Sequence, residues 1–393
     1  MDVVGFIFSI FITGFTLLYH ILENYKELTY KVGFYAWEEV SFRCTLSILT
    51  SFLISVTIGP KIIRWLKSKN INDNPEFIDS EINELNKDKS GIPTMGGLII
   101  LIGILSSTLL WAKLNNPFIQ KVIFIIIWYG IIGGVDDWLK LTIKKGSQKR
   151  DGLKAWEKLL FQFAGAVLIA SFLFHDFSNI EDGKRFWLPF YKYGIPLANW
   201  GFIIISVIYI TAMSNAANLT DGMDGLATGC VSIVSLVMVM LCYIASETMG
   251  HSNTTWAGYL LLPHIPQAGE LGIFYSAMFG SCLGFLWFNC YKAKVFMGDT
   301  GSLPLGAAIG YGAIVTRHEI LLFIIGGVFV IEMISVVLQV GYFRISGGKR
   351  IFKMAPIHHH FQKMGLSEPE IVVRFWILAI MFAILALATL KIR

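Results

Sequence analysis

The sequence predicts an all-α polytopic membrane protein, with about ten transmembrane helices and its functional residues on the cytoplasmic face. Of its 393 residues, 55% are hydrophobic and only 15% are charged, whereas a soluble domain has about a quarter charged residues. Apolar runs long enough to cross a bilayer recur along the chain, and Lys and Arg concentrate in alternate connections between them. These observations exclude a soluble globular domain, a disordered chain and a fibrous protein.

The apolar runs are continuous rather than alternating, which favours helices over the strands of a barrel. A bilayer core about 30 Å thick requires roughly 20 apolar residues in a helix. In chain order, the expected spans cover residues 43–65, 97–113, 119–135, 157–175, 199–214, 226–246, 271–288, 299–316, 319–341 and 370–391. We expect them to form a single transmembrane domain over residues 41–393.

A further apolar run, residues 3–22, precedes these spans. We interpret it as an interfacial or short membrane helix within an N-terminal extension over residues 1–40. A cleaved signal peptide is the least favoured alternative, because the run lacks a positively charged start and no small-residue cleavage site follows it before Glu23.

The placement of Lys and Arg predicts the orientation of the bundle. These residues are frequent in the connections at 60–95, 136–158 and 342–369, whereas the connections at 114–118 and 247–270 contain none. Since cytoplasmic connections of membrane proteins carry the excess of Lys and Arg, the basic set is expected on the cytoplasmic side.

Composition also limits the partners. The net charge of +5, from 32 basic and 27 acidic residues, is too small for a nucleic-acid-binding surface in a chain of this length. The five cysteines lie in or beside apolar runs without Cys-x-x-Cys spacing, so the sequence indicates neither a disulfide framework nor a zinc site.

Polar clusters from distant parts of the sequence all fall on the predicted cytoplasmic side. They are the pair Asp136 and Asp137 and the segments 215–225, 289–301 and 356–360. An active site built at one face of a helical bundle requires such a convergence.

Two of these clusters are rich in carboxylates and amides. Asp136 and Asp137 point about 100° apart on a helix, so they serve separate roles or form a solvated pair at a helix end. The second cluster has a polar residue at every third position: Asn215, Asn218, Asp221 and Asp224. Gly222 and Gly225 predict a break there, which lets side chains converge on an anion or a metal ion. The alternative is an ordinary turn rich in Asn, Asp and Gly.

The other two clusters contain an acid at the start of a span and three histidines. Asp299 can hold a hard cation such as Mg²⁺, or it can cap a helix. The residues His358, His359 and His360 cannot all bind one metal ion from a regular helix. They can instead donate hydrogen bonds to a phosphate, or form a solvated loop.

Together, these motifs resemble the phospho-N-acetylmuramoyl-pentapeptide transferase family of the polyprenyl-phosphate N-acetylhexosamine-1-phosphate transferase superfamily. The segments that carry the resemblance are residues 89–97, 134–137, 218–227, 295–302 and 354–361. The Ala-Pro-Ile-His-His-His element distinguishes this family from relatives that transfer GlcNAc-1-phosphate. The chain departs from the family pattern in its hydrophobic N-terminal extension and at Ile92, where the family usually has Thr.

The resemblance implies an enzyme of the bacterial inner membrane with ten spans. It would transfer phospho-MurNAc-pentapeptide from UDP-MurNAc-pentapeptide to undecaprenyl phosphate with Mg²⁺, releasing UMP and forming lipid I, the first membrane step of peptidoglycan synthesis. Its expected partners are these two substrates and the lipid bilayer, with a homodimer as an option and no nucleic acid.

The resemblance also implies roles for individual residues. Asp299 and Asn218 would contact Mg²⁺, and Phe296 would stack on uracil. The expected catalytic residues are Asp136, Asp137, Asp299 and His359. The expected substrate-binding residues are Lys89, Thr94, Lys140, Asn215, Asp221, Asp224, Asn289, Phe296, His358 and His360.

The role of Asp136 can be argued from phosphate chemistry. A phosphate with a second pKa near 6 is already about nine-tenths dianion at pH 7, so a base that removes its last proton gains little. We therefore favour a role for Asp136 in orienting the nucleophile or Lys140.

Two other functions are compatible with parts of the sequence. A transporter or channel would use Glu332, an acid within an apolar run, on its ion pathway; against this, the carboxylates cluster at helix ends and the halves of the chain show no repeat. A GlcNAc-1-phosphate transferase would share the acidic motifs and differ in its sugar.

Overall fold

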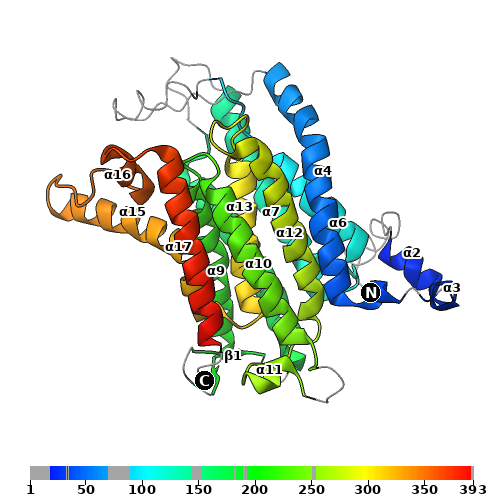
Figure 1. Ribbon diagram of the computed structural model, residues 1–393. Coiled ribbons are helices and arrows are strands. Elements are labelled where there is room, and N and C mark those ends of the chain that lie inside the picture. Colours follow the sequence, from blue (N-terminus) through cyan, green and yellow to red (C-terminus); the bar gives the residue numbers. More distant parts are fainter. Residues whose placement is uncertain are drawn as a thin grey trace.

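The computed structural model describes residues 18–31, 33, 35–69, 89, 91–142, 152–180, 183–188, 191, 193–249 and 254–390. Most of the apolar run at 3–22 and parts of the basic connections at 60–95 and 136–158 lie outside the described residues. The described chain is a bundle of long helices (Figure 1). Its fold is therefore the expected all-α, multi-pass membrane type.

Every expected span overlaps a helix. The long helices are α4 (Val40–Ser68), α6 (Gly97–Trp111), α7 (Pro117–Thr142), α8 (Ala155–Asp176), α9 (Asn199–Thr220), α10 (Leu226–Ser246), α12 (Ala268–Asn289), α13 (Asp299–Val315), α15 (Gly327–Ile345) and α17 (Glu368–Thr389). Among the described residues, eight of these are long and apolar enough to cross a membrane. The two shorter ones, α6 with 15 residues and α13 with 17, lie among them.

The expected single span at 319–341 is wrong, because the chain breaks there. The short helix α14 (Glu319–Ile325) ends at Gly326, and α15 begins at the next residue and projects sideways from the bundle (Figure 1). Two successive glycines lower the stability of a continuous helix at this point. A Cβ atom at Gly327 would lie 2.6 Å from the ring of Phe382, so α17 also packs too closely for a larger residue.

The helix α13 is the core of the bundle, since all of its residues are buried. A helix surrounded by others is apolar on all sides. Its glycines allow close packing: a Cβ atom at Gly310 would lie 2.6 Å from the carbonyl oxygen of Tyr209 on α9. This central position fixes Asp299, the first residue of α13.

Short elements occupy the ends of the bundle. They are α2 (Tyr19–Asn24), α3 (Lys26–Lys31), η1 (Ala36–Glu38), η3 (Phe177–Asn179), β1 (Arg185–Phe186), β2 (Ile195–Pro196), α11 (Trp256–Tyr259) and α16 (Ile357–Lys363). The strands β1 and β2 pair antiparallel, with Arg185 opposite Pro196. The described end of the N-terminal extension contacts the bundle through Tyr19, whose ring lies 4.8 Å from the guanidinium of Arg43.

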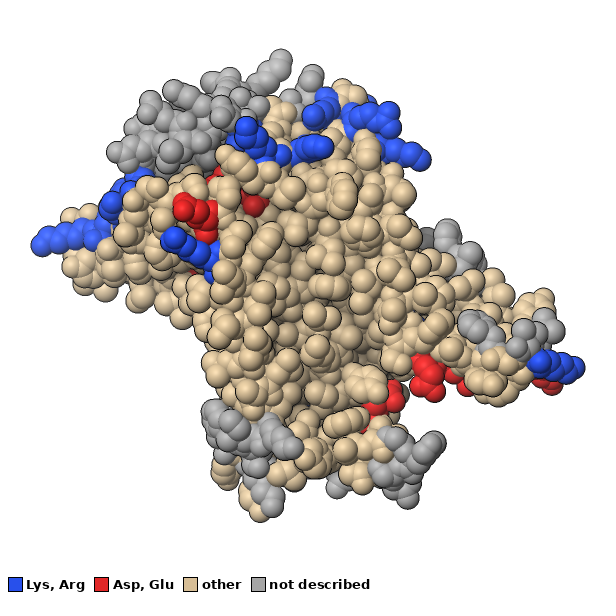
Figure 2. All heavy atoms as spheres, in the orientation of Figure 1, with Lys and Arg blue, Asp and Glu red and all other residues tan. Residues whose placement is uncertain are grey.

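The surface has a charged end and a long uncharged middle. Figure 2 shows Lys and Arg gathered near the end that carries α16, around a few recessed acidic side chains, while the sides of the bundle show almost none. Exposed side chains such as Phe172, Trp287 and Val337 cover these sides. An apolar belt of this kind is what a bilayer requires of a protein that spans it.

Candidate active site

Three carboxylates meet where α7 ends and α13 begins. Oxygen atoms of Asp136, Asp137 and Asp299 lie within 4.8 Å of one another, and all three residues are buried. We call these three residues the acidic cluster. The helices approach this closely because Gly133 has no side chain: a Cβ atom there would overlap the carbonyl oxygen of Asp299. The predicted convergence of these distant segments is confirmed.

Asp137 holds the start of α13. Its carboxylate accepts hydrogen bonds from the backbone N–H of Asp299 (3.2 Å), and from the N–H (2.9 Å) and hydroxyl (2.7 Å) of Thr300. These backbone donors have no partner within their own helix, so a carboxylate there stabilises the N-terminus. Asp136 points elsewhere and accepts the N–H of Leu153 at 2.8 Å. The two neighbouring acids thus make different hydrogen bonds, although their oxygens and that of Asp299 lie close enough together to face one cation, which the helix geometry did not predict.

Two lysines bridge Asp136 and Asp299. The Nζ atom of Lys140 lies 2.8 Å from Asp136 Oδ2 and 3.2 Å from Asp299 Oδ2. Lys158, from α8, places its Nζ 2.5 Å from Asp299 Oδ2 and 3.8 Å from Asp136 Oδ2. From the sequence alone, Lys158 belongs only to the basic connection at 136–158. Lys158 is half-buried, and nothing in its local sequence distinguishes it from the other lysines of that connection.

The acidic cluster suits a hard divalent cation. Its donor atoms are carboxylate oxygens, which Mg²⁺ prefers, and two ammonium groups already occupy positions where positive charge is stabilised. Asn218 lies beside it, with its Nδ2 2.6 Å from Asp299 Oδ1 and 2.9 Å from Ser302 Oγ. The residues present therefore fit a magnesium ion.

The predicted helix break in the polar segment 215–225 is confirmed. The helix α9 ends at Thr220, α10 begins at Leu226, and Gly225 adopts a φ of 79° between them. We call residues 221–225 the acidic turn. Burial, with the charges of Asp299 and Asp137, raises the pKa of Asp221 to about 8. Asp224 accepts the backbone N–H of Ala293 at 3.0 Å.

Lys89 lies between two carboxylates. Its Nζ is 2.8 Å from Asp224 Oδ1 and 2.6 Å from Glu368 Oε1, and it lies 5.9 Å from the ring centre of Phe296. Glu368, the first residue of α17, also accepts the backbone N–H of Asp224 at 2.7 Å. Glu368 could not be predicted from the sequence, because nothing local distinguishes it from other acids at helix starts.

Two motif segments pair through their backbones. The N–H of Phe296 donates to the carbonyl of Pro93, and the N–H of Gly96 donates to the carbonyl of Phe296, both at 2.8 Å. Thr94, which belongs to the first of these segments, is buried. The half-buried Phe296 ring is thereby fixed near Lys89.

Asn289 and Asn215 have structural contacts. The buried Asn289 accepts the backbone N–H of Gly225 at 3.2 Å, which ties α12 to the acidic turn. It also accepts the hydroxyl of Thr228 at 2.9 Å and donates to the carbonyl of Val295 at 2.9 Å. Asn215 donates to Gln162 on α8 at 2.7 Å and to the carbonyl of Thr211. Its hydrogen bonds among the described residues do not reach the acidic cluster.

The three histidines lie on α16 and have three different partners. His358 Nδ1 is 3.0 Å from Glu332 Oε2, and His359 Nδ1 is 3.1 Å from Gln362 Oε1. His360 Nδ1 accepts the backbone N–H of Lys353 at 3.1 Å. Burial lowers the pKa of His359 to about 3, so this imidazole is neutral.

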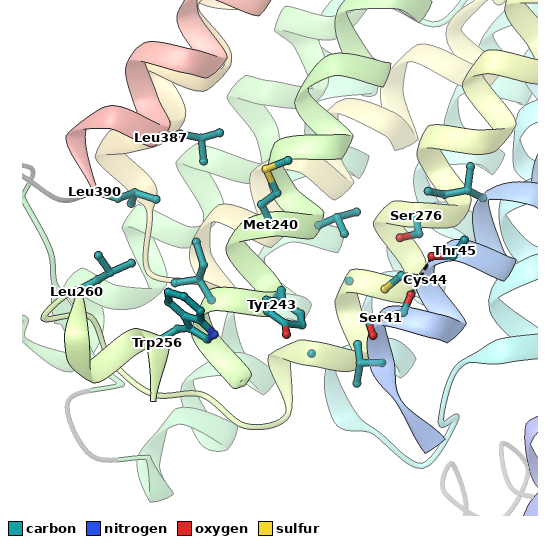
Figure 3. Close-up of a pocket in the computed structure, with 16 residues that line it drawn as sticks. Ser41, Cys44, Thr45, Met240, Tyr243, Trp256, Leu260, Ser276, Leu387 and Leu390 are labelled. Atoms are coloured by element: carbon teal, nitrogen blue, oxygen red, sulfur yellow. Dashed lines mark hydrogen bonds between the residues drawn. The ribbon is translucent and has the colours of Figure 1, made fainter. Parts of the chain in front are cut away.

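A large cavity lies away from these residues. Its volume is ≈630 Å³, and it opens between α4, α10, α12 and α17. Figure 3 shows mostly apolar side chains around it, including Tyr243, Trp256 and Leu387. No residue of the acidic cluster or the acidic turn lines it.

Comparisons with known proteins agree with this geometry. Residues 119–317 match the family model described as glycosyl transferase family 4, and residues 89–101 match signature 1 of phospho-N-acetylmuramoyl-pentapeptide-transferase. A protein of that name from Desulfotalea psychrophila is 45% identical over 377 residues, which are 96% of this chain and 100% of the relative. The chain belongs to the phospho-N-acetylmuramoyl-pentapeptide-transferase family. A relative of the same name from Thermodesulfovibrio yellowstonii is 43% identical, with the same coverage of both chains.

Membership of the phospho-N-acetylmuramoyl-pentapeptide-transferase family makes the chain a phosphoglycosyl transferase and a multi-pass bacterial membrane protein of cell wall biosynthesis. The signature covers Lys89 and Thr94. Lys89 contacts Asp224 of the acidic turn, and Thr94 lies in the segment whose backbone pairs with Phe296. The family assignment favours the transferase over the transporter alternative, and Glu332 pairs with His358.

Proposed function

We propose that this protein transfers phospho-MurNAc-pentapeptide from UDP-MurNAc-pentapeptide to undecaprenyl phosphate, forming lipid I and UMP. The observation that carries the proposal is the acidic cluster bridged by Lys140 and Lys158 beside the acidic turn. The names of the relatives support the same two substrates. We also propose that the basic end of the molecule faces the cytoplasm across the inner membrane, since Lys and Arg gather there (Figure 2).

Charge compensation is the main task of such a site. A diphosphate donor and a lipid phosphate bring several negative charges together, so transfer depends on positioning and on stabilising that charge. Asp299 and the amide oxygen of Asn218 would hold Mg²⁺, with Asp136 within reach. When bound, Mg²⁺ would neutralise the diphosphate and stabilise the leaving UMP.

The lysines complete this compensation. In the arrangement observed, Lys140 and Lys158 neutralise Asp136 and Asp299. With a cation held by Asp299, Lys140 and Lys158 would be able to bind phosphate oxygens of the substrates, while Asp136 keeps Lys140 in place. Both side chains therefore serve as phosphate ligands, which a flexible point charge suits well.

Asp136 acts on Lys140 rather than on the acceptor proton. Its Oδ2 lies 2.8 Å from Lys140 Nζ, while its Oδ1 is held by the Leu153 N–H. An acceptor phosphate that is mostly dianionic at pH 7 needs no strong base. Asp136 thus orients the lysine that receives the phosphate.

The nucleotide end of the donor would lie between the acidic turn and Phe296. The Phe296 ring offers a stacking surface, and Lys89 is held beside it by Asp224 and Glu368. The neutral His359 would line the diphosphate side.

The decisive experiment measures UMP release by the purified protein with undecaprenyl phosphate. UDP-MurNAc-pentapeptide and UDP-GlcNAc are compared, each with and without Mg²⁺, and D299N serves as the inactive control. Release from the first donor only, and only with Mg²⁺, supports the proposal. UMP release from UDP-GlcNAc would assign the protein to GlcNAc-1-phosphate transfer. If neither donor releases UMP, both transferase functions are rejected.

A further inference from the structure

Glu332 is a buried acid with no part in the site described so far. It lies on α15, the helix that projects from the bundle, and its side chain has an exposed fraction of 0%. Its Oε2 is 3.0 Å from His358 Nδ1, and its Oε1 has no hydrogen-bond partner among the described residues. A buried carboxylate is costly unless it is paired. His358 is therefore the partner that retains Glu332 in this helix.

His358 connects Glu332 to the acidic turn. Its imidazole is fully buried, and its Nε2 makes no hydrogen bond within the described chain. This Nε2 lies against Gly222: a Cβ atom added to that glycine would overlap it. The backbone N–H of Gly222 is already bonded to the carbonyl of Thr220. The ring thus packs on the backbone between Asp221 and Asp224.

The tautomer of His358 follows from these two contacts. A carboxylate only accepts hydrogen bonds, so the contact with Glu332 requires the proton on Nδ1. The other tautomer would turn a lone pair toward the carboxylate and press an N–H donor without an acceptor against Gly222. An orphaned buried donor is the more costly state.

We propose that Glu332 is a positioning residue, which holds His358 in the Nδ1–H tautomer so that its ring supports the acidic turn. The contact joins three elements: α15 through Glu332, α16 through His358 and the α9–α10 connection through Gly222. The outer part of α15 exposes Val337 and Ile345, so the same contact couples an apolar, lipid-facing helix to the turn that binds the donor. The inference rests on the proposed function, because the turn is assigned there to the nucleotide sugar.

The test compares Glu332→Gln and Glu332→Ala with the wild type. For E332A we expect KM for UDP-MurNAc-pentapeptide to rise about tenfold, since a charge-assisted hydrogen bond is lost, while KM for undecaprenyl phosphate changes less than about twofold. The glutamine variant keeps an oxygen that accepts the Nδ1–H, so it should recover most of the loss. The matched control is Glu319→Gln, which removes an equally buried carboxylate, at the start of α14, that is paired with Arg317.

A second measurement reads the tautomer without catalysis. Long-range ¹H–¹⁵N spectra of protein labelled at histidine nitrogen, with H358Q to assign the signal, should show the proton of His358 on Nδ1 in the wild type and its displacement in E332A. An unchanged His358 signal in E332A would overturn the inference. An active E332A enzyme with an unaltered KM for UDP-MurNAc-pentapeptide would also overturn it. The same holds if the activity of E332A falls only in proportion to the folded fraction and E319Q loses as much activity. A wild type without transfer would instead reject the proposed function, and the spectra would still report on the contact.

Discussion

At the scale of single residues, the candidate site depends on ion pairs between helices. Lys158 reaches Asp299 from α8, and Glu368 reaches Lys89 from α17. Sequence motifs identified one partner of each pair and missed the other. The missed partners are common residues at helix starts, and only tertiary packing selects them from many similar ones.

Lys158 is expected to be as important as the motif residues. Its replacement by methionine keeps the aliphatic stem and removes one of two cations beside Asp299. We expect kcat for UMP release to fall about 100-fold, because the variant loses one preorganised positive charge that stabilises the negative charge of the transition state. Lys154→Met, four residues earlier and exposed, is the matched control. Equal effects of both variants would assign the loss to general surface charge.

His359 gives a pH-dependent stability with a defined sign. Its pKa is about 3 when folded and about 6.5 when unfolded, so the unfolded state binds the extra proton between these values. Stability is therefore lost as pH falls from 6.5 toward 3, by about 1.4 kcal/mol per pH unit for this one group. The melting temperature of H359Q should fall less between pH 7 and pH 5 than that of the wild type. Parallel curves for the two proteins would contradict this.

At the scale of elements, hydropathy predicted where the helices lie and missed how one of them breaks. Each expected span overlaps a helix, because burial of the backbone in lipid requires helical hydrogen bonds. The break at Gly326 escaped prediction, since glycines are tolerated within membrane helices and a run of apolar residues does not reveal a change of direction. The turn at 221–225 was predicted because polar residues accompany its glycines.

The approach of α7 to α13 can be tested with two adjacent glycines. A methyl group at Gly133 would overlap the carbonyl of Asp299, whereas one at Gly134 would lie 3.8 Å from Thr300 Oγ1. Gly133→Ala should lower stability by about 1–3 kcal/mol and displace the acidic cluster, with a large loss of transfer. Gly134→Ala should change both properties little, because it meets only ordinary van der Waals contact. Thermal unfolding in detergent and UMP release provide the readouts, and a tolerated G133A would show that the helices can separate without cost.

At the scale of the whole molecule, the charge distribution places soluble and lipid chemistry at one end of the bundle. The acidic cluster, the acidic turn and α16 all lie at the basic end, and the uncharged sides below it would be in contact with lipid (Figures 1 and 2). A site at this boundary is open to a donor from water and to an acceptor whose chain stays in the membrane. The site therefore needs no channel across the bundle, which the buried core around α13 would not provide.

The same architecture predicts a reversible transfer. The proposed reaction breaks one phosphoanhydride bond in the donor and forms another in the lipid product, so little free energy separates the two sides. We expect an equilibrium constant within roughly one to two orders of magnitude of unity, without ATP. Incubation of the enzyme with lipid I and labelled UMP should return label to UDP-MurNAc-pentapeptide, with D299N as the inactive control. If label stays in UMP while the forward reaction proceeds nearly to completion, a step beyond simple exchange must drive the transfer.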